Sequence, residues 1–280
     1  MADTLTLRFL RFLPKNLISR GFGWIARRER PRFLVRPFMR WFVRRFDLDL
    51  GEAARPFETY PSLLALFTRE LRPGARPLEG GPRTLCNPVD ARVGAFGRVE
   101  SGTLFQAKGM DYSLEALLGS AEEARRFEGG AFLTLYLSPR DYHRLHSPAA
   151  GTISATLYEP GTLWPVNPPA VRTIPSLFAV NERVTAILET EIGPVAYVMV
   201  GATNVGSIRL AYRDFVSNRG GARFHERHDP PRPVERGGHL GTFELGSTVV
   251  LVVGNPDFTW RGLEAGAWMP LGREIGGLPD

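Results

Sequence analysis

From about Cys86 onward, short apolar runs alternate with turns rich in Gly and Pro, and this pattern constrains the fold more than any other feature of the sequence. The runs are rich in the β-branched and aromatic residues that favour strands. They are Ala131–Leu137, Thr152–Tyr158, Arg183–Leu188, Ala196–Val200, Thr242–Leu245 and Val249–Val253. Their spacing predicts a compact β-rich domain of sandwich or barrel type.

The first 50 residues have a different character, because they carry most of the positive charge. They hold twelve Lys and Arg against four Asp and Glu, whereas the whole chain has a formal net charge of +6. An apolar stripe recurs at every fourth position, at Leu34, Phe38, Phe42 and Phe46. A second stripe, about 200° around a helix from the first, consists of Arg36, Arg40 and Arg44. We therefore predict an α+β fold that is mainly β, with amphipathic helices in residues 1–50 and the β-rich domain in residues 51–280.

A helix with arginines on one face and Phe or Trp on the other is typical of a membrane interface. We expect the arm, residues 1–50, to contact an anionic membrane surface, which makes the protein peripheral on the cytoplasmic face of the cell membrane. The alternative is an arm that packs on its own domain or on a partner subunit. Bulky aromatic residues suit lipid better than a phosphate groove, so we expect no nucleic-acid partner. Arginines interrupt every apolar run before the roughly 20 residues that a membrane span requires.

Three segments outside these runs carry weaker patterns. Phe57–Leu71 has Leu63, Leu64, Phe67 and Leu71 on one side of a helix, and a short helix is expected at Ser113–Leu118. Arg213–Gly238 is polar and rich in Arg, His, Pro and Gly. This composition predicts a long surface loop.

Cysteine and lysine are scarce, and both shortages limit the chemistry. Cys86 is the only cysteine, so an intrachain disulfide and a cysteine-rich metal site are excluded, and we expect no metal. Lys15 and Lys108 are the only lysines. A pyridoxal enzyme needs a lysine to hold its cofactor.

Three short stretches contain the residue types of a catalytic site. They are Asn87-Pro88-Val89-Asp90, the Tyr136–Pro148 segment with His143 and His146, and Glu244-Leu245-Gly246-Ser247-Thr248-Val249. Taken singly, each is also typical of a turn, a surface loop or a β-bulge. Taken together, they supply an acid, a base and a hydroxyl, which is the set needed to activate a serine.

The order of these stretches resembles the phosphatidylserine decarboxylase family, whose members carry a Pro-Val-Asp segment, a Tyr-His-Arg-x-His segment and a Gly-Ser-Thr cleavage site. The resemblance covers roughly residues 55–255 and weakens over the last 24 residues. One departure is Ala91, where many relatives have Gly. Further matching stretches are Phe105–Gly109, Asp111–Leu114, Asn181–Arg183 and Gly201–Gly206.

The resemblance implies a self-cleaving chain. Ser247 attacks the carbonyl of Gly246, and the chain is cut into residues 1–246 and residues 247–280, the second piece beginning with a pyruvoyl group made from Ser247. His146 is the expected base, and Asp90 is expected to orient it. His143 is the expected proton donor during turnover.

The implied reaction converts phosphatidylserine to phosphatidylethanolamine and carbon dioxide, through a Schiff base between the substrate amine and the pyruvoyl carbonyl. The resemblance also implies a homodimer of processed two-chain protomers. Two other functions remain open for the residues alone. One is a membrane-associated serine hydrolase that uses the same three residues, and the other is a non-enzymatic β-domain bound to a membrane.

Overall fold

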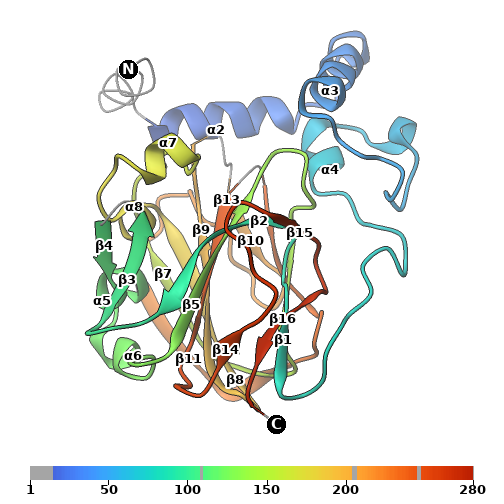
Figure 1. Cartoon of the computed structure of the whole chain (residues 1–280). Coiled ribbons are helices and arrows are strands. Elements are labelled where there is room, and N and C mark those ends of the chain that lie inside the picture. The colour runs from blue at the N-terminus through green and yellow to red at the C-terminus, as the bar shows by residue number, and fades with distance from the viewer. Residues whose placement is uncertain (1–14, 108–109, 204–206, 245–246, 280) are drawn as a thin grey trace.

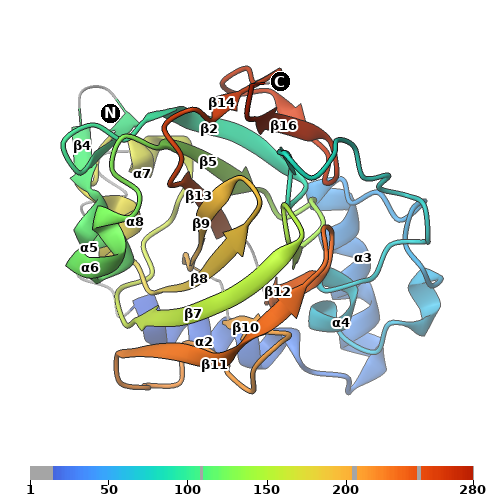
Figure 2. The same cartoon turned by 90° about the horizontal axis from the view of Figure 1, so that it is seen from below.

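A curved antiparallel sheet of eight strands forms the centre of the protein (Figures 1 and 2). The computed structural model describes residues 15–107, 110–203, 207–244 and 247–279. The strands follow the order β11 (Phe224–Val234), β7 (Gly151–Glu159), β8 (Arg183–Thr190), β9 (Gly193–Val200), β13 (Ser247–Val253), β5 (Ala131–Leu137), β2 (Ala91–Arg98) and β15 (Trp268–Met269). Five of the six predicted runs lie in this sheet. The sixth lies in β12 (His239–Phe243), although its last residue, Leu245, is outside the described residues.

Both faces of the middle of the central sheet are buried, because alternate side chains of β8, β9 and β13 enter different cores. In β13, Val249, Leu251 and Val253 belong to one hydrophobic cluster, whereas Val250 and Val252 belong to another. A strand buried on both faces reads as a continuous apolar run rather than an alternating one. This explains why the sequence of β13 is almost entirely valine and leucine.

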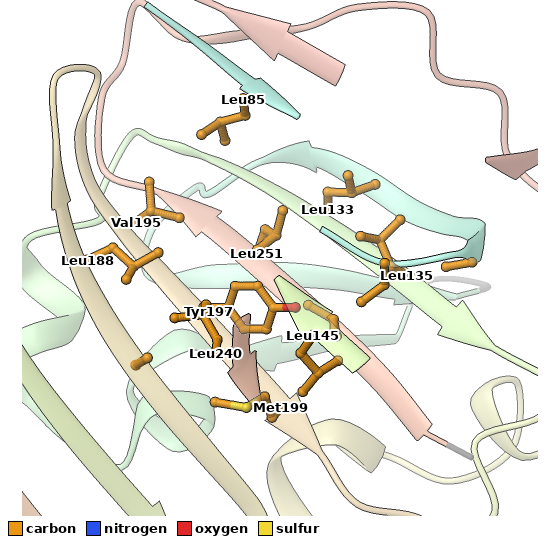
Figure 3. Packing of buried hydrophobic residues seen from close by; sticks show 14 of the residues in the cluster. Leu85, Leu133, Leu135, Leu145, Leu188, Val195, Tyr197, Met199, Leu240 and Leu251 are labelled. Atoms are coloured by element: carbon orange, nitrogen blue, oxygen red, sulfur yellow. The ribbon is translucent and has the colours of Figure 1, made fainter. Parts of the chain in front are cut away.

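Smaller sheets cover the first face. They are β1 (Thr84–Cys86), β16 (Glu274–Gly277) and β14 (Thr259–Trp260) in one sheet, and β10 (Ile208–Leu210), β12 and β6 (Arg144–His146) in another. Leu85 of β1, Leu145 of β6 and Leu240 of β12 pack with Leu133 and Leu251 of the central sheet (Figure 3). This packing connects the segment that carries the two histidines to the strand that begins with Ser247.

Short helices and a hairpin cover the second face, on the side of the molecule shown at the left of Figure 2. The elements are β3 (Thr103–Ala107), β4 (Met110–Ser113), α5 (Leu114–Leu118), α6 (Ala121–Arg125), α7 (Pro168–Val171) and α8 (Leu177–Val180). The helix predicted at Ser113–Leu118 is confirmed. Ser113 is its N-cap and accepts a hydrogen bond from the backbone N–H of Ala116.

The prediction of a loop over Arg213–Gly238 is wrong for its second half. β11 forms an eleven-residue strand at the sheet edge, antiparallel to β7, with a register shift between Arg227 and Arg232. Proline lacks an N–H, but an edge strand tolerates it because one side of the strand has no partner. The strand was missed because its side chains are polar and it contains Pro230, Pro231 and Pro233.

The prediction of one helix over Phe57–Leu71 is also wrong. The segment forms a 3₁₀ turn, η1 (Phe57–Thr59), and a five-residue helix, α4 (Leu63–Phe67). Pro61 disfavours a helical conformation at Tyr60, whose backbone is extended with φ −77° and ψ 119°. Leu71 instead forms an antiparallel bridge with Ala53.

The arm contains two helices, α2 (Lys15–Ala26) and α3 (Arg32–Phe46), which lie at the opposite end of the molecule from the C terminus (Figure 1). The expected apolar stripe of α3 is divided between two environments: Phe42 is buried in a third hydrophobic cluster together with residues of α4, whereas Leu34 is exposed. Of the apolar residues outside the stripe, Met39 is buried in the same cluster, and Phe33 and Trp41 are exposed. The arm thus packs on its own chain and also presents apolar side chains at the surface, and no helix in the described ranges is long and apolar enough to cross a membrane.

Candidate active site

Ser247 is the first residue of β13, in the middle of the central sheet. It pairs with Leu137 of β5, and its neighbour Thr248 pairs with both β5 and β9. Its side chain is buried at 1% exposure, and Oγ has no hydrogen-bond partner among the described residues. A buried hydroxyl without a partner is costly, and such groups occur at sites of chemistry. Gly246, the other half of the predicted cleavage site, lies outside the described residues.

His143 is fully buried, and its two ring nitrogens have different environments. Nδ1 lies 2.8 Å from the backbone oxygen of Asp141, whereas Nε2 has no partner in the described ranges. A carbonyl oxygen only accepts, so Nδ1 carries the hydrogen and Nε2 presents a lone pair. Burial lowers the pKa of His143 to about 3, and the imidazole is therefore neutral.

The backbone places His143 beside the strand that leads to the predicted cleavage site. The backbone N–H of Phe243 donates to the carbonyl of His143 at 3.0 Å. Phe243 is four residues before Ser247 in the sequence. Among the described residues, Nε2 of His143 and Oγ of Ser247 thus both lack a hydrogen-bond partner, and the histidine segment pairs with β12, the strand before β13 in the sequence.

His146 has hydrogen-bond partners at both ring nitrogens. Nδ1 lies 2.7 Å from the oxygen of Gly237, so it carries the hydrogen, and Nε2 lies 3.2 Å from the hydroxyl of Tyr142. Burial raises the pKa of Tyr142 to about 12, so this hydroxyl is protonated and donates to Nε2. Burial is the main cause that lowers the pKa of His146, and the charge of Asp90 acts in the opposite direction.

Asp90 binds Arg76 rather than a histidine. Arg76 forms a two-pronged ion pair with it, from Nε at 2.8 Å and from Nη2 at 2.7 Å, and the backbone N–H of Leu271 donates to the same carboxylate. Among the described residues, one hydrogen bond joins the Asp90 segment to His146 directly: the backbone N–H of His146 donates to the backbone oxygen of Pro88. The expected role of Asp90 in orienting His146 therefore stays a prediction.

Residues 67–70 hold the histidine segment in place. The ring of Phe67 lies 4.0 Å from the ring of His143, centroid to centroid. The remaining three contacts are hydrogen bonds or ion pairs: Arg144 Nε to Thr68 O, Arg69 Nη2 to Arg140 O, and Arg144 to Glu70. Because α3 packs on Phe67 through Phe42, the arm is connected to His143 by two ring contacts in series.

A cavity of about 550 Å³ opens beside these residues. Its wall on one side comes from residues 47–79, and on the other from residues 90, 140–142 and 268–273. Asp90, Asp141 and Tyr142 line it, as do the arginines Arg69 and Arg76. Neither histidine nor Ser247 is among the residues that line the cavity. Two lining residues contact the histidines: the backbone oxygen of Asp141 accepts from His143, and the hydroxyl of Tyr142 donates to His146.

Glu244 is a buried acid two residues before Gly246, and it links the arm to this part of the site. Ser207, Arg27 of the segment after α2, and Arg209 all bind its carboxylate. Burial opposes its ionisation, but these three donors outweigh burial and the pKa of Glu244 lies below its usual value. The end of β12 is thereby fixed close to the predicted cleavage position.

Sequence reasoning missed Phe67, Arg69 and Arg76. Nothing in the sequence separates Arg69, which is buried, from Arg72, which is exposed three residues later. The roles of Phe67 and Arg69 depend on contacts with residues 140–143, and that of Arg76 on ion pairs with Glu52 and Asp90, and no local sequence pattern reveals these contacts.

Comparison with known proteins decides which family these residues represent. The model of a family described as phosphatidylserine decarboxylase matches residues 63–277, and a second model, described as PSD, matches residues 5–47. The chain belongs to the phosphatidylserine decarboxylase family. Its relatives include proteins named phosphatidylserine decarboxylase proenzyme. That of Myxococcus xanthus is 42% identical over 99% of both chains, and that of Anaeromyxobacter sp. is 47% identical over 90% of both chains.

A third relative of the same name, from Shewanella baltica, is 42% identical and covers 99% of this chain and 98% of its own. The phosphatidylserine decarboxylase family is a family of lyases, so the chain is a decarboxylase. The serine hydrolase and the non-enzymatic β-domain considered from the residues alone are thereby set aside. The word proenzyme in the names of the relatives describes chains that mature after synthesis.

Proposed function

We propose that this protein decarboxylates phosphatidylserine to phosphatidylethanolamine and carbon dioxide, using a pyruvoyl group that it makes from its own Ser247. Family membership supports the reaction. The observation that carries the proposed site is a pair of buried atoms, Oγ of Ser247 and Nε2 of His143, that have no hydrogen-bond partner within the described ranges. Ser247 fits the expected cofactor because a pyruvoyl group can form only from a serine whose hydroxyl is free to react.

Maturation begins when Oγ of Ser247 attacks the carbonyl carbon of Gly246 and the amide becomes an ester. Loss of the hydrogen from Cα of Ser247 then breaks the ester, frees a carboxylate at Gly246 and leaves a dehydroalanine, which water converts to a pyruvoyl group and ammonia. A base must take the hydroxyl proton at the first step. We assign this to His146; burial lowers the pKa of this imidazole, and the charge of Asp90 opposes that shift.

During turnover, the pyruvoyl carbonyl supplies an electron sink for the electron pair that the departing carboxylate leaves behind. The residues of the chain bind the headgroup, keep water out and move protons. Nε2 of His143 is unprotonated and accepts the proton of the substrate ammonium, which frees the amine to react. The same nitrogen then returns this proton to the carbon that carbon dioxide has left. Burial beside Phe67 lowers the pKa of the free imidazole, so we propose that the negative charge of the bound headgroup offsets this shift when Nε2 takes up the proton.

The arm gives the enzyme access to a substrate that resides in a membrane. Residues 1–50 form the proposed membrane-association arm, and residues 51–280 form the decarboxylase domain. The exposed side chains of Leu17, Trp24, Phe33, Leu34 and Trp41 provide apolar area for a membrane interface. Arginines in the same helices attract anionic lipid by about 1 kcal/mol each. We place the protein at the cytoplasmic face of the cell membrane, as a homodimer of processed protomers.

Mass spectrometry of the purified protein tests this proposal. We expect two pieces, residues 1–246 and residues 247–280, with the second blocked at its start by a pyruvoyl group. The purified protein should release carbon dioxide from phosphatidylserine vesicles, whereas Ser247→Ala should remain uncut and inactive. A free serine amine at the start of the small piece would contradict the pyruvoyl assignment.

A further inference from the structure

Arg69 is a buried arginine without an acidic partner in the part of the chain that the structure describes. Its exposure is 4%, and only Nη2 has a hydrogen-bond partner, the backbone oxygen of Arg140 at 3.2 Å. Nε and Nη1 have none among the described residues, and both atoms are covered by the surrounding protein. Arg76 lines the same cavity and forms ion pairs with both Asp90 and Glu52. The guanidinium of Arg76 is thus occupied by two carboxylates, whereas that of Arg69 has nitrogens without an acceptor among the described residues.

A buried charge without a partner is expensive, because its hydration is lost and nothing replaces it. The energy is recovered when a ligand supplies the missing acceptor. Burial lowers the pKa of Arg69, while Tyr60, Asp90 and Asp49 raise it, and an arginine in this balance is charged at neutral pH. Two nitrogens of a charged guanidinium are therefore ready to donate.

The position of Arg69 connects it with the proposed chemistry. It lies in the wall of the 550 Å³ cavity together with Asp90, Asp141 and Tyr142. It follows Phe67, whose ring contacts His143, by two residues. Its charge also contributes to the lowered pKa of His143, so the two side chains are within electrostatic range.

A guanidinium has donors but no acceptor, and its planar fork matches the paired oxygens of a carboxylate or a phosphate. A phosphatidylserine headgroup contains both groups. The carboxylate loses its charge as carbon dioxide leaves, so an ion pair to it would stabilise the ground state more than the transition state and slow the reaction. The phosphodiester keeps its charge throughout.

We propose that Arg69 binds the phosphodiester of the substrate in this cavity and thereby positions the serine end toward His143 and residue 247. This assignment rests on the proposed function, since it takes phosphatidylserine as the substrate. Arg69 is a positioning residue, and its loss should affect binding of any ligand that has the phosphodiester, with or without the carboxylate.

The test compares Arg69→Gln, Arg69→Lys and the control Arg72→Gln, all as processed enzyme with soluble short-chain phosphatidylserine. Short-chain phosphatidylethanolamine, which has the phosphodiester but no carboxylate, serves as the inhibitor. We expect Arg69→Gln to raise KM about ten- to a hundredfold, as for a lost hydrogen bond to a charged group. The inhibition constant of phosphatidylethanolamine should rise by a similar factor, kcat should fall less than KM rises, and Arg72→Gln should match wild type.

Thermal melting separates binding from structure. Replacement of an unpartnered buried charge should leave the melting temperature unchanged or raise it. If KM rises while phosphatidylethanolamine binds as before, Arg69 holds the carboxylate and the proposal is overturned. Unchanged KM and inhibition constant, with or without a lower melting temperature, also overturn it.

If Arg69→Gln does not fold, Arg69→Lys carries the test, because it keeps the charge and loses the fork. If Arg69→Lys raises KM and the inhibition constant by up to about a hundredfold, the proposal is supported. If both constants equal those of wild type, it is rejected. An uncut or inactive wild-type protein would contradict the proposed function. An active wild type in which Arg69 substitutions have no effect would contradict only the role proposed for Arg69.

Discussion

His143 and His146 lie three residues apart, yet the structure gives them different capabilities. His143 presents a free lone pair at Nε2, whereas the corresponding nitrogen of His146 accepts from Tyr142. For His146 to take the proton of Ser247, Tyr142 must move aside or pass the proton on. The assignment of maturation to His146 and turnover to His143 is therefore sharply testable.

His143→Ala should be cut normally but turn over at least about a hundredfold more slowly, because proton transfer typically contributes that much. His146→Ala and Asp90→Asn should be largely uncut, with the aspartate change the milder if Asp90 only orients the base. Gel electrophoresis reports the cut, and carbon dioxide release reports turnover. An uncut His143→Ala beside a cut His146→Ala would reverse the two roles.

The buried His143 should also make stability depend on pH. Its pKa is about 3 in the folded chain and 6.5 in the unfolded chain, so between these values only the unfolded chain binds the proton. Stability is therefore complete above pH 6.5 and falls as the pH decreases toward 3, by up to about 1.4 kcal/mol per pH unit. His239, with a pKa of about 4, acts in the same direction.

The measurement is urea unfolding at several pH values in the uncut Ser247→Ala background. Adding His143→Gln should reduce the loss of unfolding free energy between about pH 7 and about pH 5 by about 1–2 kcal/mol. Equal pH dependence with and without His143 would show that this side chain is protonated in the folded chain.

At the scale of elements, the buried strands could be predicted because continuous runs of β-branched residues are typical of strands that are covered on both faces. β11 could not, since an edge strand tolerates polar residues and proline. The helix over Phe57–Leu71 failed at Pro61, and the stripe of α3 showed amphipathic character without showing which apolar side chains pack internally. The candidate residues Asp90, His143, His146 and Ser247 came from a family resemblance, whereas the support from residues 67–70 depends on long-range contacts.

The division of the α3 stripe makes single surface substitutions a better test of membrane binding than removal of the arm. Truncation would strip Phe42 from Phe67 and disturb the support of His143. Trp41→Ser changes a side chain that is 52% exposed. It should weaken sedimentation with anionic vesicles about tenfold, since burying an aromatic side chain contributes on the order of 1.5–3 kcal/mol.

The cut at Gly246 should be unaffected in Trp41→Ser. Phe96→Ser is the matched control, because Phe96 is an exposed aromatic residue of β2 and is 38% exposed. Unchanged sedimentation of Trp41→Ser together with weaker sedimentation of Phe96→Ser would place the membrane contact on the β-rich domain.

At the scale of the whole molecule, the fold brings together segments that are far apart in the sequence. The cavity takes its walls from the end of the arm, from the segment before β1, from the histidine segment and from residues near the C terminus. The sequence predicted the two parts, arm and β-rich domain, but each wall of the cavity arises from a different part of the chain. The cavity could therefore be found only in three dimensions.

The central place of β13 has a consequence for the lifetime of the mature enzyme. β13 pairs with β5 along its full length and with β9 along most of it, and the strands that follow it pair with β1 and β2. With the proposed cut before Ser247, the piece from residue 247 onward becomes a separate chain whose strands are paired with those of residues 1–246. Unfolding then separates two chains for each protomer, and its midpoint depends on protein concentration.

We expect the melting temperature of processed enzyme to rise more steeply with concentration than that of uncut Ser247→Ala, in which only the proposed dimer contact is lost. Calorimetry over a hundredfold range of concentration distinguishes the two cases, and equal behaviour would mean that the pieces do not part on unfolding. Before the cut, folding is a first-order event within a single chain. After it, refolding requires two separate chains to meet again, which is a second-order event. We therefore expect the cut protein to recover from unfolding less readily than the uncut chain.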